Sequence, residues 1–276
     1  MTRRALARTL VYASLIAASL VVLLPLGVVL MTSLKSAREV ANDSGALTFP
    51  DDPFDLHNYM TAFQDGRMLL SFVNTAFILV FSVGGTVLIG SMAAYAIDRF
   101  AFRLKKLVVA LFLLAALVPG VTTQVATFQI VNSFGMFDTR WAPIALYMGT
   151  DIVSIYIFLQ FVRSIPTSLD EAARLDGANA FTIYRKIIFP LLKPAVATVV
   201  IVKGIAVYND FYIPFLYMPS DDLGVISTSL FRFRGPFGAH WEIISAGTIL
   251  VILPTLIVFL ALQRYIYNGF TTGATR

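Results

Sequence analysis

The chain has 276 residues, of which 58% are hydrophobic and only 13% are charged, and its mean hydropathy is +0.78. Soluble domains carry roughly a quarter charged residues, so this composition predicts a polytopic membrane protein. The formal net charge is +5, which we attribute to membrane topology because no basic stripe suited to nucleic acid is present. The chain has no Cys, and its two His, His57 and His240, fall in expected outer loops. We therefore expect no disulfide, metal site or bound cofactor.

Hydrophobic windows predict an all-α fold with six transmembrane helices, each close to the roughly 20 residues that a bilayer requires. In chain order the windows cover residues 9–32, 70–96, 107–128, 141–162, 194–217 and 243–263. The third contains Pro119 and Gly120, so we expect a bent or broken span there. The first follows Arg3, Arg4 and Arg8 but is too long for the apolar region of a signal peptide, so we expect a retained helix.

These windows divide the chain into four parts. We expect an N-terminal transmembrane helix over residues 1–33, an extracytoplasmic loop over 34–69, a membrane core over 70–266 and a tail over 267–276. The loop is acidic and rich in turn-forming residues, with Pro50, Asp51, Asp52, Pro53 and Asp55. We expect it to be ordered against the outer mouth of the membrane core.

The distribution of cations predicts the orientation. Fourteen of the 21 Lys and Arg residues fall in segments on one side of the predicted membrane, six fall on the other, and Lys203 lies inside a span. Cytoplasmic loops carry the excess of positive charge. The chain is therefore predicted to be a multi-pass protein of a bacterial-type cytoplasmic (inner) membrane, with both termini in the cytoplasm.

A polar stretch over residues 165–190 interrupts the apolar pattern on the inner side. Ser168 and Glu171 have capping-box spacing, and Gly177 suits a left-handed helix stop, which predicts a helix over 169–176. Asn179 is placed to cap a second helix, and Pro190 is expected to stop it.

The surface of this stretch suggests that it contacts a partner. Small side chains at Ala172 and Ala173 would leave a low surface, and Glu171, Arg174 and Asp176 would supply charges around it. In the second helix the apolar residues that share one face are Phe181, Tyr184, Ile187 and Ile188. The alternative is a short amphipathic helix that lies on the lipid headgroups.

Several motifs carry a resemblance to a known family. The polar stretch reads E-A-A-R-L-D-G and then I-I-F-P, and further motifs are A-A-Y-A-I-D-R-F (93–100), Pro119-Gly120, Y-N-D-F-Y-I-P (208–214) and Q-R-Y-I-Y-N-G-F-T-T-G-A (263–274). The chain resembles, over nearly its whole length, the integral membrane permeases of ATP-binding cassette (ABC) importers, in the carbohydrate-uptake branch and specifically the smaller permease of the pair. Two departures are Tyr208, where this branch more often has Trp, and the short tail that ends at Arg276.

The resemblance implies a type I importer permease fold and a set of partners. It implies half of a translocation pathway for a sugar or related solute, paired with a second, related permease and two copies of an ATPase, and supplied by an extracytoplasmic solute-binding protein. It also implies that the 165–190 loop couples the permease to the ATPase. The residues expected to form this coupling element are Glu171, Ala172, Ala173, Arg174, Asp176, Gly177 and Pro190.

Three ionisable residues lie within predicted spans, where charge is costly and usually faces a partner or a cavity. They are Asp151, Lys203 and Asp210. Lys203 and Asp210 are seven residues apart, roughly 10 Å along a helix, and cannot pair unless the helix breaks. For Lys203 we expect a salt bridge to Asp151 or to another span, or a side chain that reaches toward the membrane surface.

The segment around Asp210 is the candidate solute pathway. Asn209 and Asp210 are flanked by Tyr208, Phe211 and Tyr212, and sugars bind through hydrogen bonds to amides and carboxylates and through ring faces packed on aromatic side chains. The alternative is that Asp210 pairs with a cation of the companion subunit.

The sequence lacks the residues of an enzyme. It contains no G-x-x-x-x-G-K-[ST] phosphate loop and no zinc or nucleophile motif, so we expect no catalytic residues and a separate subunit for ATP hydrolysis. Alternatives are a permease for a non-sugar solute such as an amino acid or polyamine, and a carrier or membrane enzyme that acts alone.

Overall fold

The structure, a computed structural model, describes residues 3–42, 48–149, 151–236 and 238–274, with side chains outside 3–7, 116, 258–259 and 261–276. It divides into two compact units, Met1–Leu69 with Ser229–Ala261 and Leu70–Thr228 with Leu262–Arg276. Each unit is described by itself. Helices dominate both, as the composition predicted.

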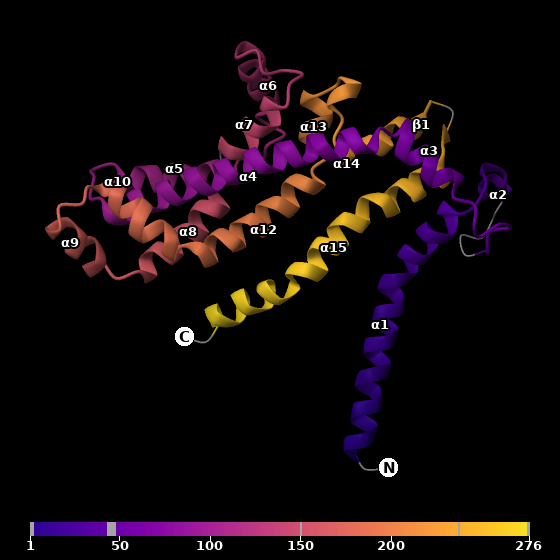
Figure 1. Cartoon of the computed structure of the whole chain (residues 1–276), viewed down its shortest axis with the longest axis horizontal. Helices are drawn as coiled ribbons and strands as arrows, with labels where there is room; N and C mark the ends of the chain where they lie inside the picture. Colours follow the sequence, from indigo (N-terminus) through magenta and orange to yellow (C-terminus); the bar gives the residue numbers. More distant parts are fainter. Residues whose placement is uncertain (1–2, 43–47, 150, 237, 275–276) are drawn as a thin grey trace. The chain divides into compact units, whose positions relative to one another are not determined.

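The first unit is built on two long helices, both visible in Figure 1. Its elements are α1 (Arg3–Ser33), α2 (Ala37–Asn42), α3 (His57–Asp65), the 3-10 helix η3 (Leu230–Phe233), the short strands β1 (Arg234–Gly235) and β2 (Gly238–Ala239), and most of α15 (Trp241–Ala274). Asn58 of α3 donates to the carbonyls of Ser33 and Lys35 at 2.9 and 2.8 Å. These bonds satisfy carbonyls at and just beyond the end of α1, which have no partner within the helix.

A capping box begins α2. The Ser36 amide donates to the Glu39 carboxylate at 2.7 Å, and the Glu39 amide donates to the Ser36 hydroxyl oxygen at 3.3 Å. The other Glu39 oxygen accepts from the Asp51 amide at 2.8 Å. Hydrogen bonds from the Ser36 side chain and from these two amides hold the pKa of Glu39 below its usual value, because they favour the charged form. One carboxylate therefore joins the start of α2 to the segment around Asp51.

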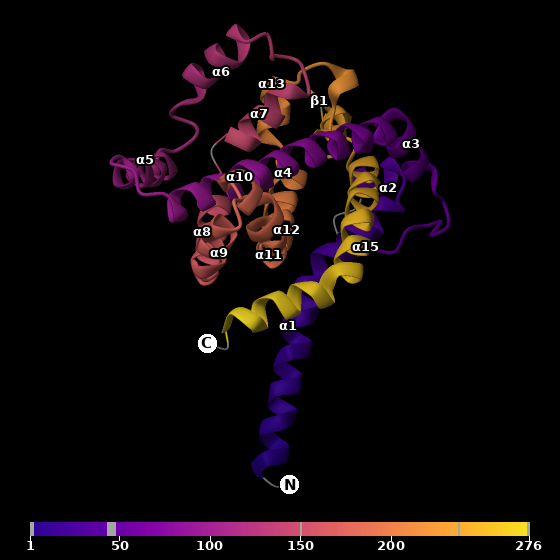
Figure 2. The ribbon, with the colours of Figure 1, turned by 60° about the vertical axis from the view of Figure 1, so that its left-hand side comes forward.

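The second unit is a bundle around α4. Its helices are α4 (Met68–Arg99), α5 (Lys105–Leu117), α6 (Gln124–Ser133), α7 (Trp141–Gly149), α8 (Ile152–Ser164), α9 (Ser168–Leu175), α10 (Ala180–Ile183), the π-helix η1 (Tyr184–Ile188), α11 (Phe189–Leu191), α12 (Lys193–Asn209), α13 (Tyr212–Tyr217), η2 (Asp221–Leu223) and α14 (Ile226–Ser229). In Figures 1 and 2, α8 and α12 lie beside α4. The core between them includes Phe158, Ile183, Ile188 and Val199, all fully buried.

The six predicted windows fall largely on helical residues, but the count of six spans is not confirmed. Among the described residues, two helices, α1 and α4, are long and apolar enough to cross a membrane, and up to four spans are present if each bent helix pair counts as one. The expected break at Pro119 and Gly120 is confirmed, since α5 ends at Leu117 and α6 begins at Gln124.

Two further breaks were not expected. The predicted continuous helices over 141–162 and 194–217 are wrong, because α8 begins after Asp151 and α12 ends at Asn209. The last helix runs as far as Ala274, through most of the predicted tail, and the final two residues of that tail lie outside the described part.

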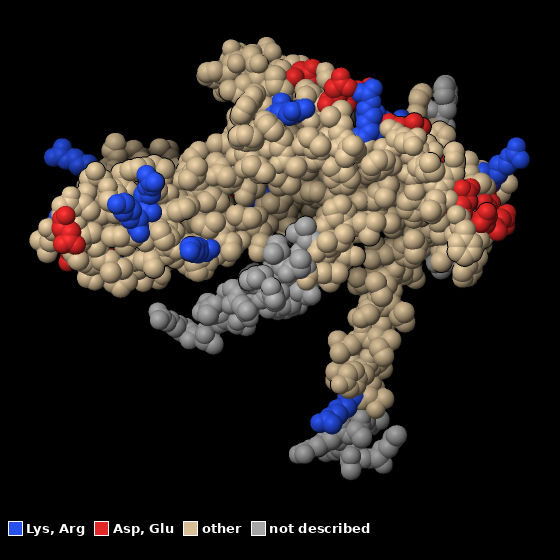
Figure 3. Space-filling model, viewed as in Figure 1, with Lys and Arg blue, Asp and Glu red and all other residues tan. Residues whose placement is uncertain are grey.

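Charged side chains are unevenly spread over the second unit. On the face shown in Figure 3 they lie over the end that holds α9 and α10 and over the loop that follows α13. The surface along α4 between these ends is almost free of charge on this face. This pattern suits a bundle whose middle lies in hydrocarbon.

Candidate functional site

The polar stretch folds as the predicted helix, glycine turn and helix. The turn after α9 is a Schellman motif, in which the Ala178 amide donates to the Ala173 carbonyl at 2.9 Å and the Gly177 amide to the Arg174 carbonyl at 3.0 Å. Gly177 has φ +80°, and a Cβ there would meet no atom within 4 Å. The requirement for glycine is therefore conformational, as the sequence predicted.

The two predicted caps have different outcomes. Asn179 caps α10 as expected, since its side-chain oxygen accepts from the Thr182 amide at 2.8 Å. The predicted capping box of Ser168 and Glu171 is wrong, because α9 begins one residue earlier, with Thr167 as its N-cap and no side-chain cap bond. Glu171 is instead exposed.

Pro190 does not stop the second helix, contrary to the prediction. The helix widens into the π-helix η1, where the Phe189 amide donates to the Tyr184 carbonyl, and continues through Pro190 to Leu191. In a regular α-helix the proline ring would clash with the carbonyl four residues earlier, so a wider turn accommodates it. The chain then bends by 73° between α11 and α12.

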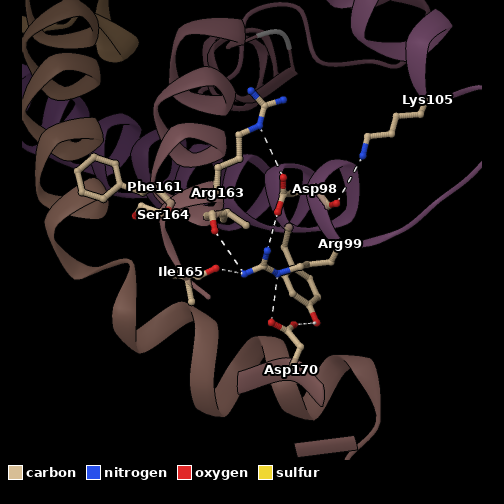
Figure 4. Close-up of polar contacts among 10 residues, drawn as sticks. Asp98, Arg99, Lys105, Phe161, Arg163, Ser164, Ile165 and Asp170 are labelled. Atoms are coloured by element: carbon tan, nitrogen blue, oxygen red, sulfur yellow. Dashed lines mark hydrogen bonds and ion pairs between the residues drawn. The ribbon is translucent and has the colours of Figure 1, made fainter. Parts of the chain in front are cut away.

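The N-terminal end of α9 is held by Arg99, the last residue of α4 (Figure 4). The Arg99 Nε lies 3.1 Å from the Asp170 carboxylate of α9, and both side chains are about 5% exposed. This contact is an ion pair without good hydrogen-bond geometry, since neither atom has a hydrogen-bond partner. The Tyr95 hydroxyl donates to the other Asp170 oxygen at 3.2 Å.

The same arginine also caps α8. Its Nη2 donates to the Ile165 carbonyl at 2.6 Å, and its Nη1 donates to the Asp98 carboxylate at 2.7 Å. Arg163 of α8 adds a longer ion pair to Asp98, 3.6 Å between Nε and Oδ1. We call Asp98, Arg99 and Asp170 the arginine clamp. It ties the ends of α4 and α8 to α9, so these three helices are fixed at one point.

A second attachment joins the other half of the loop to α4. The hydroxyl groups of Tyr184 and Ser91 are hydrogen-bonded at 2.7 Å, both residues being buried. The Tyr184 ring packs 5.7 Å from that of Tyr95 and 5.8 Å from that of Phe189. The helix face turned to the core is formed by Ile183, Tyr184 and Ile188, which are buried. The Phe181 ring lies 6.4 Å from that of Tyr184, consistent with the predicted shared face, but Phe181 is 60% exposed.

The surface that α9 leaves free differs from the predicted one. Ala173 is buried and packs in the core, so it does not form part of a low outer surface. Ala172, Glu171, Arg174 and Asp176 are exposed as expected. Leu175 is 90% exposed, and Leu169 is 41% exposed. With Ala172 they stand three residues apart and form an apolar stripe, which we call the α9 stripe.

The intramembrane charges form a chain of contacts in the second unit. Lys203 Nζ lies 3.1 Å from Asp151 Oδ2, with both side chains largely buried, so the expected pair is confirmed. Asp151 also caps α8, accepting from the Ser154 amide at 3.3 Å and the Ser154 hydroxyl at 2.8 Å. The Lys203 ammonium is 5.8 Å from the centre of the Tyr147 ring, a cation–π arrangement.

Asp210 lies at the other end of this chain. One of its oxygens accepts from the Tyr147 hydroxyl at 2.9 Å, and the other accepts from the amides of Tyr212 and Ile213 at 2.8 and 3.3 Å. The break after α12 is thus stabilised by a carboxylate that caps α13. Tyr147 thus contacts both Lys203 and Asp210, and among the described residues Lys203 pairs with Asp151 rather than with Asp210.

The remaining pathway candidates are placed differently from Asp210. Asn209, Phe211 and Tyr212 are exposed, whereas Tyr208 is half-buried. The Asn209 side-chain amide donates to the Ile205 carbonyl at 3.0 Å. The rings of Phe211 and Phe215 stack at 5.0 Å.

Sequence reasoning missed four residues of these sites. Arg99 and Tyr95 stand in the quoted A-A-Y-A-I-D-R-F motif, and the adjacent acid and base at its end were the available signal. Asp170 had no such signal, because its partner is 71 positions away. Tyr147 lies within an apolar window, where nothing in the sequence distinguished it from the lipid-facing and core residues around it.

Comparison with known proteins identifies the class. Residues 86–271 match the family described as the inner membrane component of binding-protein-dependent transport systems, and the chain belongs to this family. It is therefore a permease subunit of an ABC transporter and an inner membrane component, and it is not the subunit that hydrolyses ATP.

Curated relatives are similar over almost the whole chain. The melibiose/raffinose/stachyose import permease protein MelC of Bacillus subtilis is 32% identical over 92% of this chain and 91% of its own. The multiple sugar-binding transport system permease protein MsmG of Streptococcus mutans is 32% identical over 96% of each chain.

Solved structures show the fold. A chain from a bacterial ABC transporter involved in import of the acidic polysaccharide alginate has a TM-score of 0.80 at 22% identity, with coverage of 96% of this chain and 98% of that one. The fold is therefore that of an ABC importer permease, as the resemblance implied.

Proposed function

We propose that the chain forms half of the translocation pathway of an ABC importer for a sugar or oligosaccharide. The observation that carries the proposal is the end-to-end similarity to relatives named as import permeases for melibiose, raffinose and stachyose and for multiple sugars. A non-sugar solute such as an amino acid or polyamine has no such support. A carrier that acts alone does not fit a binding-protein-dependent family.

The proposed assembly contains this chain, a second related permease, two copies of an ATPase and an extracytoplasmic solute-binding protein. Within it the chain crosses the membrane six times, with 1–33 as a separate first helix, 34–69 outside, 70–266 as the core, and both termini in the cytoplasm. The excess of Lys and Arg in the segments assigned to the inner side supports this orientation.

The α9 stripe is the proposed ATPase contact. A leucine that is 90% exposed at the tip of an inner loop is unfavourable in water and favourable in a partner's apolar groove. Ala172 in the middle of the stripe would let that partner approach closely. Glu171, Arg174 and Asp176 would form the polar rim, with Gly177 and Pro190 setting the shape of the loop.

The arginine clamp is the proposed transmission element. Movement of α9 by the ATPase would act on Arg99, which is the last residue of α4 and also contacts the end of α8. Rigid-body movement of packed helices can switch a site between two openings, provided that the connection does not yield. The buried ion pair and the bond between Tyr184 and Ser91 supply two such connections.

Solute contact is proposed for the exposed groups beside the break after α12. Asn209, Phe211 and Tyr212 offer an amide and two aromatic faces, while Tyr208 is partly covered. Asp210 positions this segment, because both of its carboxylate oxygens are occupied within the chain. A direct contact of Asp210 with solute would require it to release one of these groups.

Affinity purification from the native membrane tests the assembly and its contact together. We expect an ATPase and a second permease to co-purify with the wild type, and the ATPase to be lost with Leu175→Glu. Leu104→Glu is the matched control, since Leu104 is also exposed, at 60%, on the predicted inner side. A wild-type chain that purifies alone would refute the assembly, and retention of the ATPase by Leu175→Glu would refute the contact.

A further inference from the structure

An arginine that directly precedes α7 has no acidic partner within the described part of the chain. Among the residues that the structure describes, Arg140 makes no hydrogen bond or ion pair, and its Nε is buried without an acceptor. The nearest acid in sequence, Asp138, is held in a left-handed conformation with φ +56°, and its carboxylate accepts from the Ser220 amide and hydroxyl. The guanidinium is therefore partly buried and lacks an anion.

Three aromatic rings form a cluster beside this cation, and one of them is in contact with it. The Arg140 Cζ lies 5.5 Å from the centre of the Phe77 ring, which fixes the guanidinium on a ring face. The Trp141 ring lies 5.9 Å from that of Phe77 and 5.7 Å from that of Phe81. Phe81 and Trp141 are 44% and 52% exposed. A cation thus adjoins an open apolar surface.

This composition selects one class of ligand. A neutral sugar needs several convergent polar groups, whereas the cluster supplies a single cation and aromatic rings. A planar guanidinium fork suits the paired oxygens of a phosphate, and exposed rings suit a hydrocarbon chain. The matching ligand is an anion that carries an apolar tail.

The position of the cluster agrees with such a ligand. Arg140 directly precedes α7, the first half of a bent helix pair that is long and apolar enough to span a membrane. Arginine and tryptophan at the end of a span lie at the depth of the headgroups. We propose that Arg140, Phe77, Phe81 and Trp141 bind a phospholipid, with the phosphate on Arg140 and an acyl chain along Phe81 and Trp141. This site is separate from the transport role.

Lipid retention by the purified full transporter in nanodiscs tests the proposal. The probes are phosphatidylglycerol and diacylglycerol, which lacks the phosphate, counted by native mass spectrometry. We expect the wild type to retain phosphatidylglycerol and Arg140→Gln to retain about tenfold less, the loss typical of one charge-assisted phosphate contact. Diacylglycerol retention should not change. Arg140→Lys keeps the charge without the fork and should fall between the two.

The control is Arg234→Gln. Arg234 also stacks on a tryptophan, 5.8 Å from the centre of the Trp241 ring, but it is exposed and should leave retention unchanged. Equal retention by wild type and Arg140→Gln would overturn the proposal. Displacement of the lipid by millimolar glycerol 3-phosphate would assign the site to a free anion instead. Loss of the second permease in Arg140→Gln with unchanged lipid would assign Arg140 to a subunit contact.

Discussion

Removal of the negative charge from the arginine clamp should uncouple transport from ATP hydrolysis. Asp170→Asn keeps the size of the side chain and its ability to accept from Tyr95 but removes the ion pair with Arg99. Breaking a buried pair costs about 3–5 kcal/mol when the remaining charge is left alone. Arg99 keeps the Asp98 carboxylate and the Ile165 carbonyl, so the smaller loss of a charge-assisted contact, about 2 kcal/mol, applies.

A loss of about 2 kcal/mol makes the detached state of α9 about 30-fold more populated. Two assays report this change. Amide hydrogens of α9 should exchange about 30-fold faster in the variant, because exchange follows the population of the open state. In proteoliposomes, the number of solute molecules imported per ATP hydrolysed should fall several-fold, while the ATPase remains bound through the α9 stripe.

Asp176→Asn is the matched control. It makes the same change of charge on the same loop, but Asp176 is exposed and has no part in the clamp. If Asp170→Asn and Asp176→Asn had the same amide exchange rates in α9 and the same import per ATP, the arginine clamp would not hold α9. The proposed transmission through Arg99 would then be refuted.

Three further predictions concern Gly177, Lys203 and Glu39. Gly177→Ala should destabilise the turn after α9 by about 1–2 kcal/mol, because residue 177 has a left-handed φ, and should lower the number of solute molecules imported per ATP hydrolysed. Gly135 also has a positive φ, +66°, and equally open surroundings, so Gly135→Ala should leave that number unchanged. Lys203→Met should lower the unfolding temperature of the purified chain because Asp151 loses its cation. Adding Asp151→Asn to this variant should restore most of the lost unfolding temperature. Equal unfolding temperatures for wild type and Lys203→Met would contradict the pairing. Since the pKa of Glu39 is lowered in the folded state, its contribution to stability should be complete above the ordinary pKa of 4.5 and should disappear as the pH falls through the lower folded pKa. As the pH falls, the exchange of α2 amide hydrogens in the wild type should therefore accelerate relative to their exchange in Glu39→Gln. Identical pH profiles for these two proteins would refute the role of this carboxylate.

Local chemistry was the part of the fold that the sequence predicted well. Gly177 and Asn179 act on backbone groups two or three residues away, so their types and spacing sufficed. The capping box shows the limit of this reasoning. Ser168 and Glu171 have the required spacing and form no box, whereas Ser36 and Glu39 have the same spacing and form one. The choice depends on where packing starts the helix, which spacing alone does not determine.

The breaks in the membrane helices were hidden for a different reason. A hydropathy window averages over about 19 residues, so one carboxylate in an apolar run barely lowers it. Asp151 and Asp210 were recognised as costly, but their capping of α8 and α13 was not predicted. The arginine clamp depends on contacts across long sequence separations, which a single sequence does not reveal.

Uptake by the reconstituted complex tests the central claim most directly. Proteoliposomes that contain this chain with its co-purified partners would be supplied with a panel of labelled oligosaccharides and the solute-binding protein outside, and with ATP inside. The account predicts sugar accumulation that requires both ATP and the binding protein, with no effect of a proton gradient. Uptake that continues without ATP and follows a proton gradient would contradict it.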